Sequence, residues 1–438
     1  MASSDQQTAR GDQERIVSLE WYRSLRGGGR SAFWAGAFGW ALDAYDFMIY
    51  TFALSAIATV FSLSSGQSGL IATVTLVVSA LGGALAGILA DRIGRVRTLM
   101  ITIAAYALFT FLSGLAPNYE LLLIFRALQG LGFGGEWAAG AILVAEISNA
   151  KQRGRTLGAI QSFWAIGWGL AAVVFVIVFS IAPPELAWRI MFWLGILPAL
   201  LILYIRAKVP EPEIYVGTRE QKEERTEEAL ERGATTPAFV QIFRPDLLRT
   251  TVAASILSMG AQGGYYSIFT WLPSYLESER ELTVVGTGSY TAIVIIGSFV
   301  GYIVSGYVHD WLGRRPTFAL YSTFSGLLIF AYTQIPTGAN TLLLILGFPL
   351  GFFASGIFSG FGSYLAELYP SRCRGAGQGF SYNFGRGMGA AFPAMIGFLS
   401  AVIGLTGAIA FGALAYGLCL ISLLFLRETR GKTLVVLD

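Results

Sequence analysis

One short charged motif occurs twice in the chain, about half the length of the chain apart. The segment Gly87-Ile-Leu-Ala-Asp-Arg-Ile-Gly-Arg95 returns as Gly306-Tyr-Val-His-Asp-Trp-Leu-Gly-Arg314, 219 positions later. A long apolar stretch precedes each copy, and another follows it. A charged hairpin between two hydrophobic spans, repeated once in each half, predicts a membrane transporter built from two related halves.

The composition favours lipid as the surroundings of the chain. It is 54% hydrophobic and 13% charged, with a mean hydropathy of +0.61, whereas about 25% of residues are charged in ordinary soluble proteins. The net charge of +3 gives no indication of a nucleic-acid partner. Cys373 and Cys419 lie in or beside apolar spans and suggest no disulfide framework. The first 30 residues are polar and lack the apolar core of a cleavable signal peptide.

Segments long enough to cross a bilayer recur along the whole chain. A spanning helix needs about 20 mostly apolar residues. The twelve candidates lie near 32–60, 67–90, 98–116, 120–148, 155–181, 187–208, 247–276, 284–308, 315–335, 340–369, 375–403 and 406–427. The sequence therefore predicts an all-α membrane protein with twelve transmembrane helices in two pseudo-symmetric six-helix halves.

The distribution of polar residues divides the chain into five parts. These are an N-terminal cytoplasmic tail (1–30), two six-helix halves (31–208 and 247–427), a linker between them (209–246) and a C-terminal cytoplasmic tail (428–438). The linker is rich in acidic and basic residues, so we expect a water-soluble spacer. Binding of a partner through these charges is the alternative.

Basic residues orient the predicted helices. When both termini are placed in the cytoplasm, every Lys and Arg falls on that side except Arg126, Arg189, Arg280 and Arg386. This distribution follows the positive-inside rule. We therefore expect a multi-pass protein of the cell inner (plasma) membrane with both termini in the cytoplasm. As a separate expectation, the protein is a monomer.

A second repeat marks the cytoplasmic ends of helices. Glu146 precedes Arg153 by seven residues, and Glu367 precedes Arg374 by the same interval. We expect these residues and the motif loops to act as gating latches, in which Asp91 meets helix ends or arginines of the other half. The alternative is that they only set topology. The predicted gating residues are Gly87, Asp91, Arg92, Gly94, Arg95, Glu146, Arg153, Asp310, Arg314, Glu367 and Arg374.

These motifs resemble signatures of the major facilitator superfamily. The loop 87–95 resembles its best-known signature, 126–132 resembles a second one, and 428–433 resembles the segment that closes many sugar and organic-acid members. The similarity extends over residues 31–434. It implies the major facilitator fold, transport by alternating access, and spans one, four, seven and ten around a central cavity.

A finer resemblance concerns the substrate. Residues 39–46 on span one and 382–386 on span eleven resemble the sialate and monocarboxylate proton symporters. Span seven departs from that branch, because only Gln262 corresponds to its polar run. The aromatic content suggests a neighbouring branch that carries aromatic or other organic acids. The resemblance therefore implies the transport of an organic anion together with protons.

Acidic residues inside the spans are the candidates for carrying protons. Asp43 and Asp46 share one face of span one, and Asp46 lies about 20 Å above the cytoplasmic start of the helix. A desolvated carboxylate holds its proton more readily, as a proton carrier requires. Arg126 and Glu136 share one face of span four. Arg126 either holds an acid of span one until that acid is protonated or forms a permanent ion pair. Asp46 is the first choice as proton carrier, followed by Asp43, and Glu136 is the alternative.

Arg386 is the candidate anchor for the anion. It lies near the expected midplane of span eleven, and its planar guanidinium can hold a carboxylate by two hydrogen bonds. Because an arginine is costly in hydrocarbon, it either binds substrate or pairs with an internal acid. Aromatic residues such as Trp40, Tyr50 and Tyr266 either line the cavity or only pack against neighbouring helices. The predicted substrate-binding residues are Arg386, Asn383, Tyr382, Gln262, Gln129 and Tyr265.

The sequence shows no sign of catalysis or of a bound cofactor. We find no metal-ligand cluster, no phosphate-binding glycine loop and no nucleophile beside a base. His309 replaces a small residue of the repeated motif, and we expect it to be solvated. We therefore expect neither an enzyme nor a cofactor or metal site, and the expected partners are protons, lipid and a small organic anion.

The most consistent interpretation is a secondary active transporter that imports a monocarboxylate, aromatic or sugar acid by proton symport. A proton-driven exporter of drugs or metabolites is the first alternative, although span five lacks the Gly-Pro-rich motif that such exporters often show. A membrane sensor with a transporter fold is the second, although the tails and linker are too short to relay a signal. The identity of the acid and the number of protons stay open.

Overall fold

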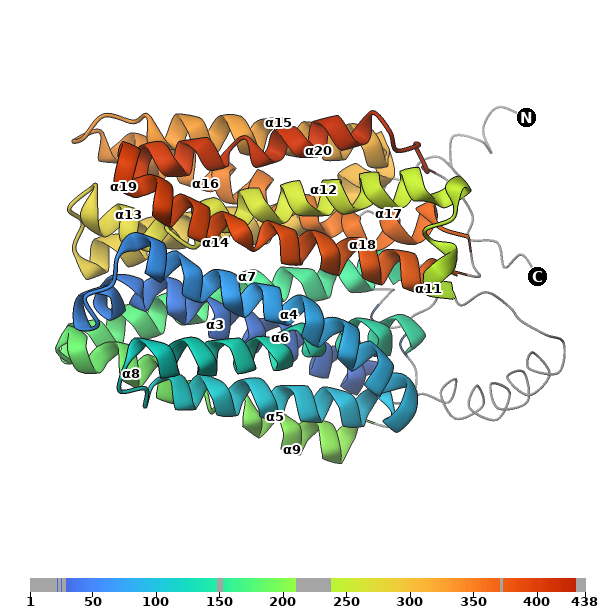
Figure 1. The fold of residues 1–438 in the computed structure, drawn as a ribbon, viewed down its shortest axis with the longest axis horizontal. Coiled ribbons are helices and arrows are strands. Elements are labelled where there is room, and N and C mark those ends of the chain that lie inside the picture. The colour runs from blue at the N-terminus through green and yellow to red at the C-terminus, as the bar shows by residue number, and fades with distance from the viewer. Residues whose placement is uncertain are drawn as a thin grey trace, which may run out of the picture.

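The molecule is an elongated bundle of helices (Figure 1). The structure, a computed structural model, describes Tyr22, Leu25 and residues 29–147, 153–209, 238–370 and 373–430. Every regular element in these ranges is a helix. The predicted all-α fold class is therefore confirmed.

The first half of the bundle comprises the helices α3 to α9. Pro198 lies in the short break between α8 and α9, which together form the sixth span. The bounds are α3 (Gly29–Val60), α4 (Ser65–Ile93), α5 (Arg95–Ser113), α6 (Tyr119–Ile147), α7 (Arg153–Ile181), α8 (Pro184–Leu194) and α9 (Ala199–Lys208).

The second half comprises the helices from α11 onward, several of which are likewise interrupted. Gly404, with φ 75°, lies inside α19 and separates the eleventh span from the twelfth. The bounds are α11 (Ala238–Gln241), α12 (Pro245–Phe269), α13 (Leu272–Ser278), α14 (Val284–Leu312), α15 (Arg314–Thr333), α16 (Asn340–Gly356), the 3-10 helix η1 (Ile357–Gly360), α17 (Phe361–Leu368), α18 (Arg374–Gly389), α19 (Ala391–Gly412) and α20 (Ala415–Leu423).

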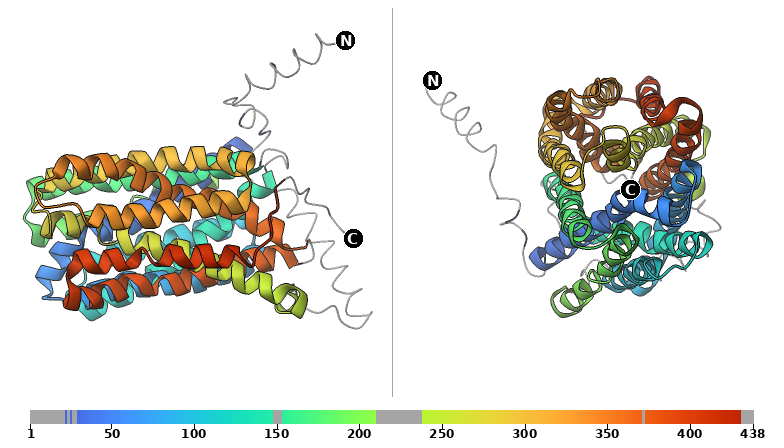
Figure 2. Two further views of the ribbon diagram at one scale, coloured as in Figure 1. Left: turned by 90° about the horizontal axis from the view of Figure 1, so that it is seen from above. Right: turned by 90° about the vertical axis from the view of Figure 1, so that its left-hand side faces the viewer.

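These helices make twelve spans within the described residues, as the sequence predicts. Eight stretches of the described chain are long and apolar enough to cross a membrane. The two halves form two groups, one below the other in Figure 1 and again in the end-on view of Figure 2. We call the end of the bundle that contains Gly29 and Arg430 the tail end, and the end that contains Val60 and Pro184 the far end.

Matching turns show that the two halves are related. Gly94, between α4 and α5, has φ 106° and ψ 157°, and Gly313, between α14 and α15, has φ 105° and ψ 168°. Only glycine adopts such a conformation without a steric penalty. The N-caps of α4 and α14 also correspond, because the side chains of Ser64 and Thr283 each accept a hydrogen bond from the backbone three residues later. The 219-residue spacing of the motif therefore holds for both ends of the helix.

The halves meet most closely at the far end. A Cβ atom at Gly69 of α4 would collide with the carbonyl oxygen of Pro393, and one at Gly397 of α19 would collide with the carbonyl oxygen of Ser65. The backbone amide of Ala394 donates to Oγ1 of Thr73 across the same surface, at 3.1 Å. Main-chain contact between α4 and α19 therefore closes this end of the bundle.

Candidate functional site

Among the described residues, three acidic and two arginine side chains lie deep inside the bundle. Asp43, Asp46, Arg126, Glu136 and Arg386 are each at most 2% exposed. They come from α3, α6 and α18, so both halves contribute. Buried charges in a membrane are costly and mark sites of function or ion pairing. The structure thus brings together the acids and arginines that the sequence singles out.

Asp46, Arg126 and Gln129 form the first of two groups. Gln129 donates a hydrogen bond from Nε2 to Oδ2 of Asp46, and Asp46 and Arg126 attract each other electrostatically. The guanidinium of Arg126 lies 5.1 Å from the ring centre of Tyr50 and 5.6 Å from that of Phe192. No nitrogen of this guanidinium has a hydrogen-bond partner among the described residues. Aromatic faces and one carboxylate therefore hold Arg126.

Asp43, Glu136 and Arg386 form the second group. Asp43 interacts electrostatically with Glu136 and more weakly with Arg386. The carboxylate of Glu136 lies against Gly39 of α3, where a Cβ atom would collide with it. Two carboxyl groups and one guanidinium therefore lie close together where the two halves meet. Such a pair of acids strongly disfavours carrying two negative charges at once.

Gln262 of α12 orients Arg386. Nε of Arg386 donates to Oε1 of Gln262 at 3.4 Å, and Nε2 of Gln262 donates to the carbonyl oxygen of Tyr382 at 3.1 Å. The hydroxyl of Tyr266 also donates to Oε1 of Gln262, at 3.4 Å. The guanidinium lies 5.5 Å from the ring centre of Phe133 and 5.3 Å from that of Tyr382. Three of the predicted substrate-binding residues, Arg386, Gln262 and Tyr382, thus lie together.

Aromatic side chains from both halves surround Arg386. Phe47 stacks on Phe133, with ring centres 5.9 Å apart. It also packs against Trp164 at 6.2 Å and Tyr266 at 5.8 Å, and Trp164 packs against Trp40 at 5.0 Å. We call Phe47, Phe133, Trp164 and Tyr266 the aromatic wall. The predicted site residues omit Phe47, Phe133 and Trp164. Phe47 could have been found from the sequence, because it lies one helical turn after Asp43. Phe133 could have been found in the same way, because it lies one turn from both Gln129 and Glu136. No sequence pattern marks Trp164.

Asn383 and Tyr265 occupy different surroundings. Nδ2 of Asn383 donates to the carbonyl oxygen of Gly379 at 3.0 Å, and its Oδ1 lies against Gly83 of α4. The hydroxyl of Tyr265 accepts a hydrogen bond from Nε1 of Trp164 at 2.8 Å. Asn383 therefore packs against the first half, and Tyr265 links α12 to α7.

The second copy of the motif makes an ion-paired network at the tail end. Arg314 donates to both carboxylate oxygens of Glu367, at 3.1 and 2.8 Å, and to Oδ1 of Asp310 at 2.8 Å. The hydroxyl of Thr429 also donates to Glu367. Arg374 donates from Nε to the carbonyl oxygen of Ala366, the residue before Glu367. These contacts join helices of the same half.

Glu428 caps the helix that follows the motif. Its carboxylate accepts hydrogen bonds from the backbone amides of Arg314 and Arg315, at 2.9 and 2.8 Å. Burial acts to raise the pKa of Glu428, but the backbone hydrogen bonds outweigh it and hold the pKa below its ordinary value. We call these residues, with Asp310, Glu367 and Thr429, the tail-end network.

The first copy of the motif is described mainly through its backbone. Gly94 forms the turn between α4 and α5. For the other predicted latch positions of the first half, the structure describes the backbone but not the side chains. These positions are Gly87, Asp91, Arg92, Arg95, Glu146 and Arg153.

His309 differs from the expectation of a solvated side chain. It is 2% exposed, and its ring centre lies 4.8 Å from that of Phe318. Neither ring nitrogen has a hydrogen-bond partner among the described residues. The expectation was wrong because the last turn of α14 packs against α15 and Gly360 of η1 and does not face water. Within the described ranges, no group of three His, Cys, Asp or Glu side chains is placed to hold a metal ion.

Two matched halves of membrane-spanning helices, meeting around buried acids and arginines, define a membrane transporter architecture. The chain belongs to the Major Facilitator Superfamily, whose family pattern matches residues 36–393. The resemblance seen in the sequence motifs is thereby confirmed.

Known proteins with similar sequences include organic-acid transporters. The chain is 40% identical over 415 residues to a probable 4-methylmuconolactone transporter of Cupriavidus pinatubonensis, covering 94% of this chain and 93% of the relative. It is 33% identical over 398 residues to a cis,cis-muconate transport protein of Acinetobacter baylyi, covering 88% and 92%. Among solved structures, the proton:xylose symporter XylE bound to 6-bromo-6-deoxy-D-glucose matches with a TM-score of 0.71 at 21% identity, covering 92% of this chain and 97% of that one. This likeness concerns the fold alone.

Proposed function

We propose that the protein imports a planar, unsaturated organic acid anion by proton symport, leaving the acid chemically unchanged. The observation that carries the proposal is the position of Arg386, which Gln262 orients beside the aromatic wall and close to Asp43 and Glu136. A carboxylate can take two hydrogen bonds from the guanidinium, while a flat carbon skeleton packs against aromatic faces. The names of the two relatives support this substrate class.

The proposed coupling uses the acids beside Arg386. When both are charged, Asp43 and Glu136 repel each other and Asp43 attracts Arg386. Binding of one proton to this pair removes the repulsion and weakens the hold on Arg386, which then accepts the substrate carboxylate. Asp43 and Glu136 therefore take precedence over Asp46, because Asp46 is engaged by Gln129 and Arg126.

The proposed cycle is alternating access. With the far end closed by α4 and α19, release requires the tail end to open, and the two halves rock about the buried site. We propose that residues 31–208 and 247–427 are the rocking halves, that 209–246 joins them, and that the motif loops are latches. We also propose that the protein is a monomer of the inner membrane with both termini in the cytoplasm, so that the tail end faces the cytoplasm.

Substitution of Arg386 tests the proposal directly. We expect Arg386→Gln to weaken binding of cis,cis-muconate by about tenfold to a hundredfold, because a charge-assisted hydrogen-bonded pair contributes about 1.5–3 kcal/mol. Binding to purified protein is measured by titration calorimetry, and uptake is measured in proteoliposomes with an imposed pH gradient. Arg206→Gln, at an exposed position in the last turn of α9, is the matched control. Unchanged muconate affinity in Arg386→Gln removes this residue from the site.

A second ligand tests the role of the aromatic wall. Adipate has the same number of carbon atoms and carboxylates as muconate but a flexible, saturated chain. We expect muconate to bind more tightly than adipate, and Phe133→Leu to reduce this preference by about threefold to tenfold, as expected for loss of one aromatic contact. Equal binding of the two acids to the unaltered protein contradicts the proposed selectivity for planar acids.

A further inference from the structure

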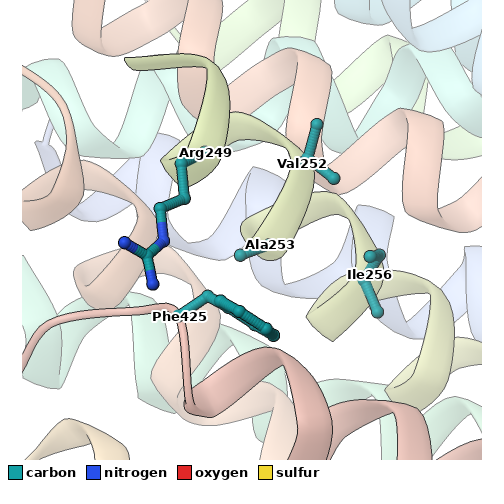
Figure 3. A pocket seen from close by; sticks show the side chains of 5 residues that line it. All are labelled: Arg249, Val252, Ala253, Ile256 and Phe425. Atoms are coloured by element: carbon teal, nitrogen blue, oxygen red, sulfur yellow. The ribbon is translucent and has the colours of Figure 1, made fainter. Parts of the chain in front are cut away.

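A groove on the outside of the bundle lies apart from the transport site. It has a volume of about 200 Å³ and is lined by Arg249, Val252, Ala253 and Ile256 of α12 and by Phe425, which follows α20 (Figure 3). The residues of α12 are spaced so that all four share one helix face. Nothing in the proposed transport cycle uses this face.

The charge in this groove has no acidic partner in the part of the chain that the structure describes. Arg249 is exposed, and its guanidinium lies 5.3 Å from the ring centre of Phe425. Among the described residues, no carboxylate lies within ion-pair distance of Arg249. A guanidinium at the edge of a membrane-spanning helix is suited to hold a phosphate group.

The depth of the groove matches the layers of a bilayer leaflet. Arg249 lies one turn after Pro245, where α12 begins at the tail end. Ile256 lies about 10 Å deeper along the helix axis, because each residue adds about 1.5 Å. Val252 is 49% exposed and Phe425 is 50% exposed, so both present apolar surface to the surroundings of the bundle. The groove therefore offers a positive charge at headgroup depth and an apolar track at acyl-chain depth.

We propose that this groove binds one anionic phospholipid of the leaflet at the tail end. The phosphate lies on Arg249, and an acyl chain runs along Val252, Ile256 and Phe425. Because α12 packs against α18, which carries Arg386, the bound lipid contacts the outer face of a helix whose inner face lines the site. The proposal depends on the membrane-spanning fold and not on the identity of the transported acid.

Native mass spectrometry of the full-length protein tests the proposal. Purified protein in detergent is titrated with phosphatidylglycerol or phosphatidylcholine, and the bound lipids are counted. We expect about fivefold weaker retention of the first phosphatidylglycerol in Arg249→Gln, the effect of one basic side chain near an anionic headgroup. Arg206→Gln removes the same charge at the same end of the bundle and is expected to retain the lipid normally. Val252→Trp, which fills the groove, is expected to weaken retention as Arg249→Gln does.

Four outcomes overturn the proposal. Equal retention of phosphatidylglycerol by Arg249→Gln and the unaltered protein removes Arg249 from the lipid site. An equal loss in Arg206→Gln means that general charge, not the groove, attracts the lipid. Equally tight binding of phosphatidylcholine, whose phosphate charge is balanced by choline, shows a site that does not select anionic lipids. Displacement of the lipid by millimolar inorganic phosphate shows that Arg249 binds a free anion and not a lipid headgroup. Each outcome is independent of whether muconate binds, so this test and the test of the transport function can fail separately.

Discussion

Arg126 and Arg386 are both buried, yet their surroundings suit different tasks. The rings of Tyr50 and Phe192 support Arg126, and its nitrogens make no hydrogen bond to a described residue. Arg386 is oriented by a hydrogen bond to Gln262. A side chain that is oriented before its ligand arrives loses less entropy on binding. At the scale of single residues, this difference supports the proposal that Arg386, and not Arg126, anchors the carboxylate.

The acids beside Arg386 give a second prediction at this scale. We expect Asp43→Asn and Glu136→Gln each to abolish uptake driven by a pH gradient but to retain exchange of substrate across the membrane. A neutral amide cannot release a proton during the cycle, whereas in the proposed site the guanidinium and the aromatic wall bind the substrate. Accumulation and exchange of labelled muconate in proteoliposomes separate the two effects.

A control on the same helix makes this prediction specific. Glu120 is exposed in the first turn of α6, so Glu120→Gln is expected to accumulate substrate normally. If both Asp43→Asn and Glu136→Gln still accumulate substrate, the proton is carried elsewhere, and Asp46 is the next candidate.

The charged residues of the candidate site could be predicted from the sequence, but the contacts between them could not. Asp43, Glu136 and Arg386 could be predicted because ionisable residues are rare in apolar spans. The pairing of Gln262 with Arg386 and the position of Trp164 depend on contacts between α12, α18 and α7. Asn383 illustrates the limit: it lies three residues before Arg386, yet its side chain contacts Gly379 and Gly83.

At the scale of helices, the structure follows the sequence where local chemistry decides. Gly94 and Gly313 occur where two helices must turn sharply, so the motif predicts both turns. The break inside α19 at Gly404 falls between the predicted spans 375–403 and 406–427. The break between α8 and α9 was not predicted, because it lies inside the single apolar span 187–208. The cap that Glu428 provides for α15 also escapes prediction, since it joins positions 114 residues apart.

Glu428 leads to a prediction about stability and pH. Because its pKa in the folded protein is lowered, its charge stabilises the fold above the ordinary pKa, and this stabilisation is lost as the pH falls through the lowered value. We expect Glu428→Gln to reduce stability by about 0.5–1 kcal/mol at pH 7, the size of a charge at a helix N-terminus. The difference in Tm between the two proteins is expected to shrink below about pH 4. A constant difference from pH 7 to pH 3 contradicts this account.

At the scale of the whole molecule, glycines determine how closely the halves approach. Gly69 and Gly397 let α4 and α19 meet through their backbones. A single methyl group at this surface must push the halves apart or shift a helix, because backbone atoms cannot give way as a flexible side chain does.

Gly69→Ala is therefore expected to open the far end. Ser55 contacts Ser274 there, at 3.1 Å between the hydroxyl oxygens, so the rate of maleimide labelling of Ser55→Cys reports closure. The native Cys373 and Cys419 are buried and give little background. We expect faster labelling in Gly69→Ala and no change in Gly417→Ala, where a Cβ atom meets nothing within 4 Å. Equal labelling rates in both variants contradict a closure set by backbone contact.

The contrast between backbone packing at the far end and ion pairs in the tail-end network bears on how the molecule responds to dissolved salt. Counterions screen exposed charges over about 8–10 Å at physiological ionic strength, but they leave van der Waals contact between main chains untouched. Raising the salt concentration is thus expected to weaken the exposed pair of Arg314 with Asp310, which lies within the second half, while sparing the contact between the halves at the far end. Salt on the tail-end side of the membrane therefore acts on the stability of the second half and leaves the seal at the far end intact.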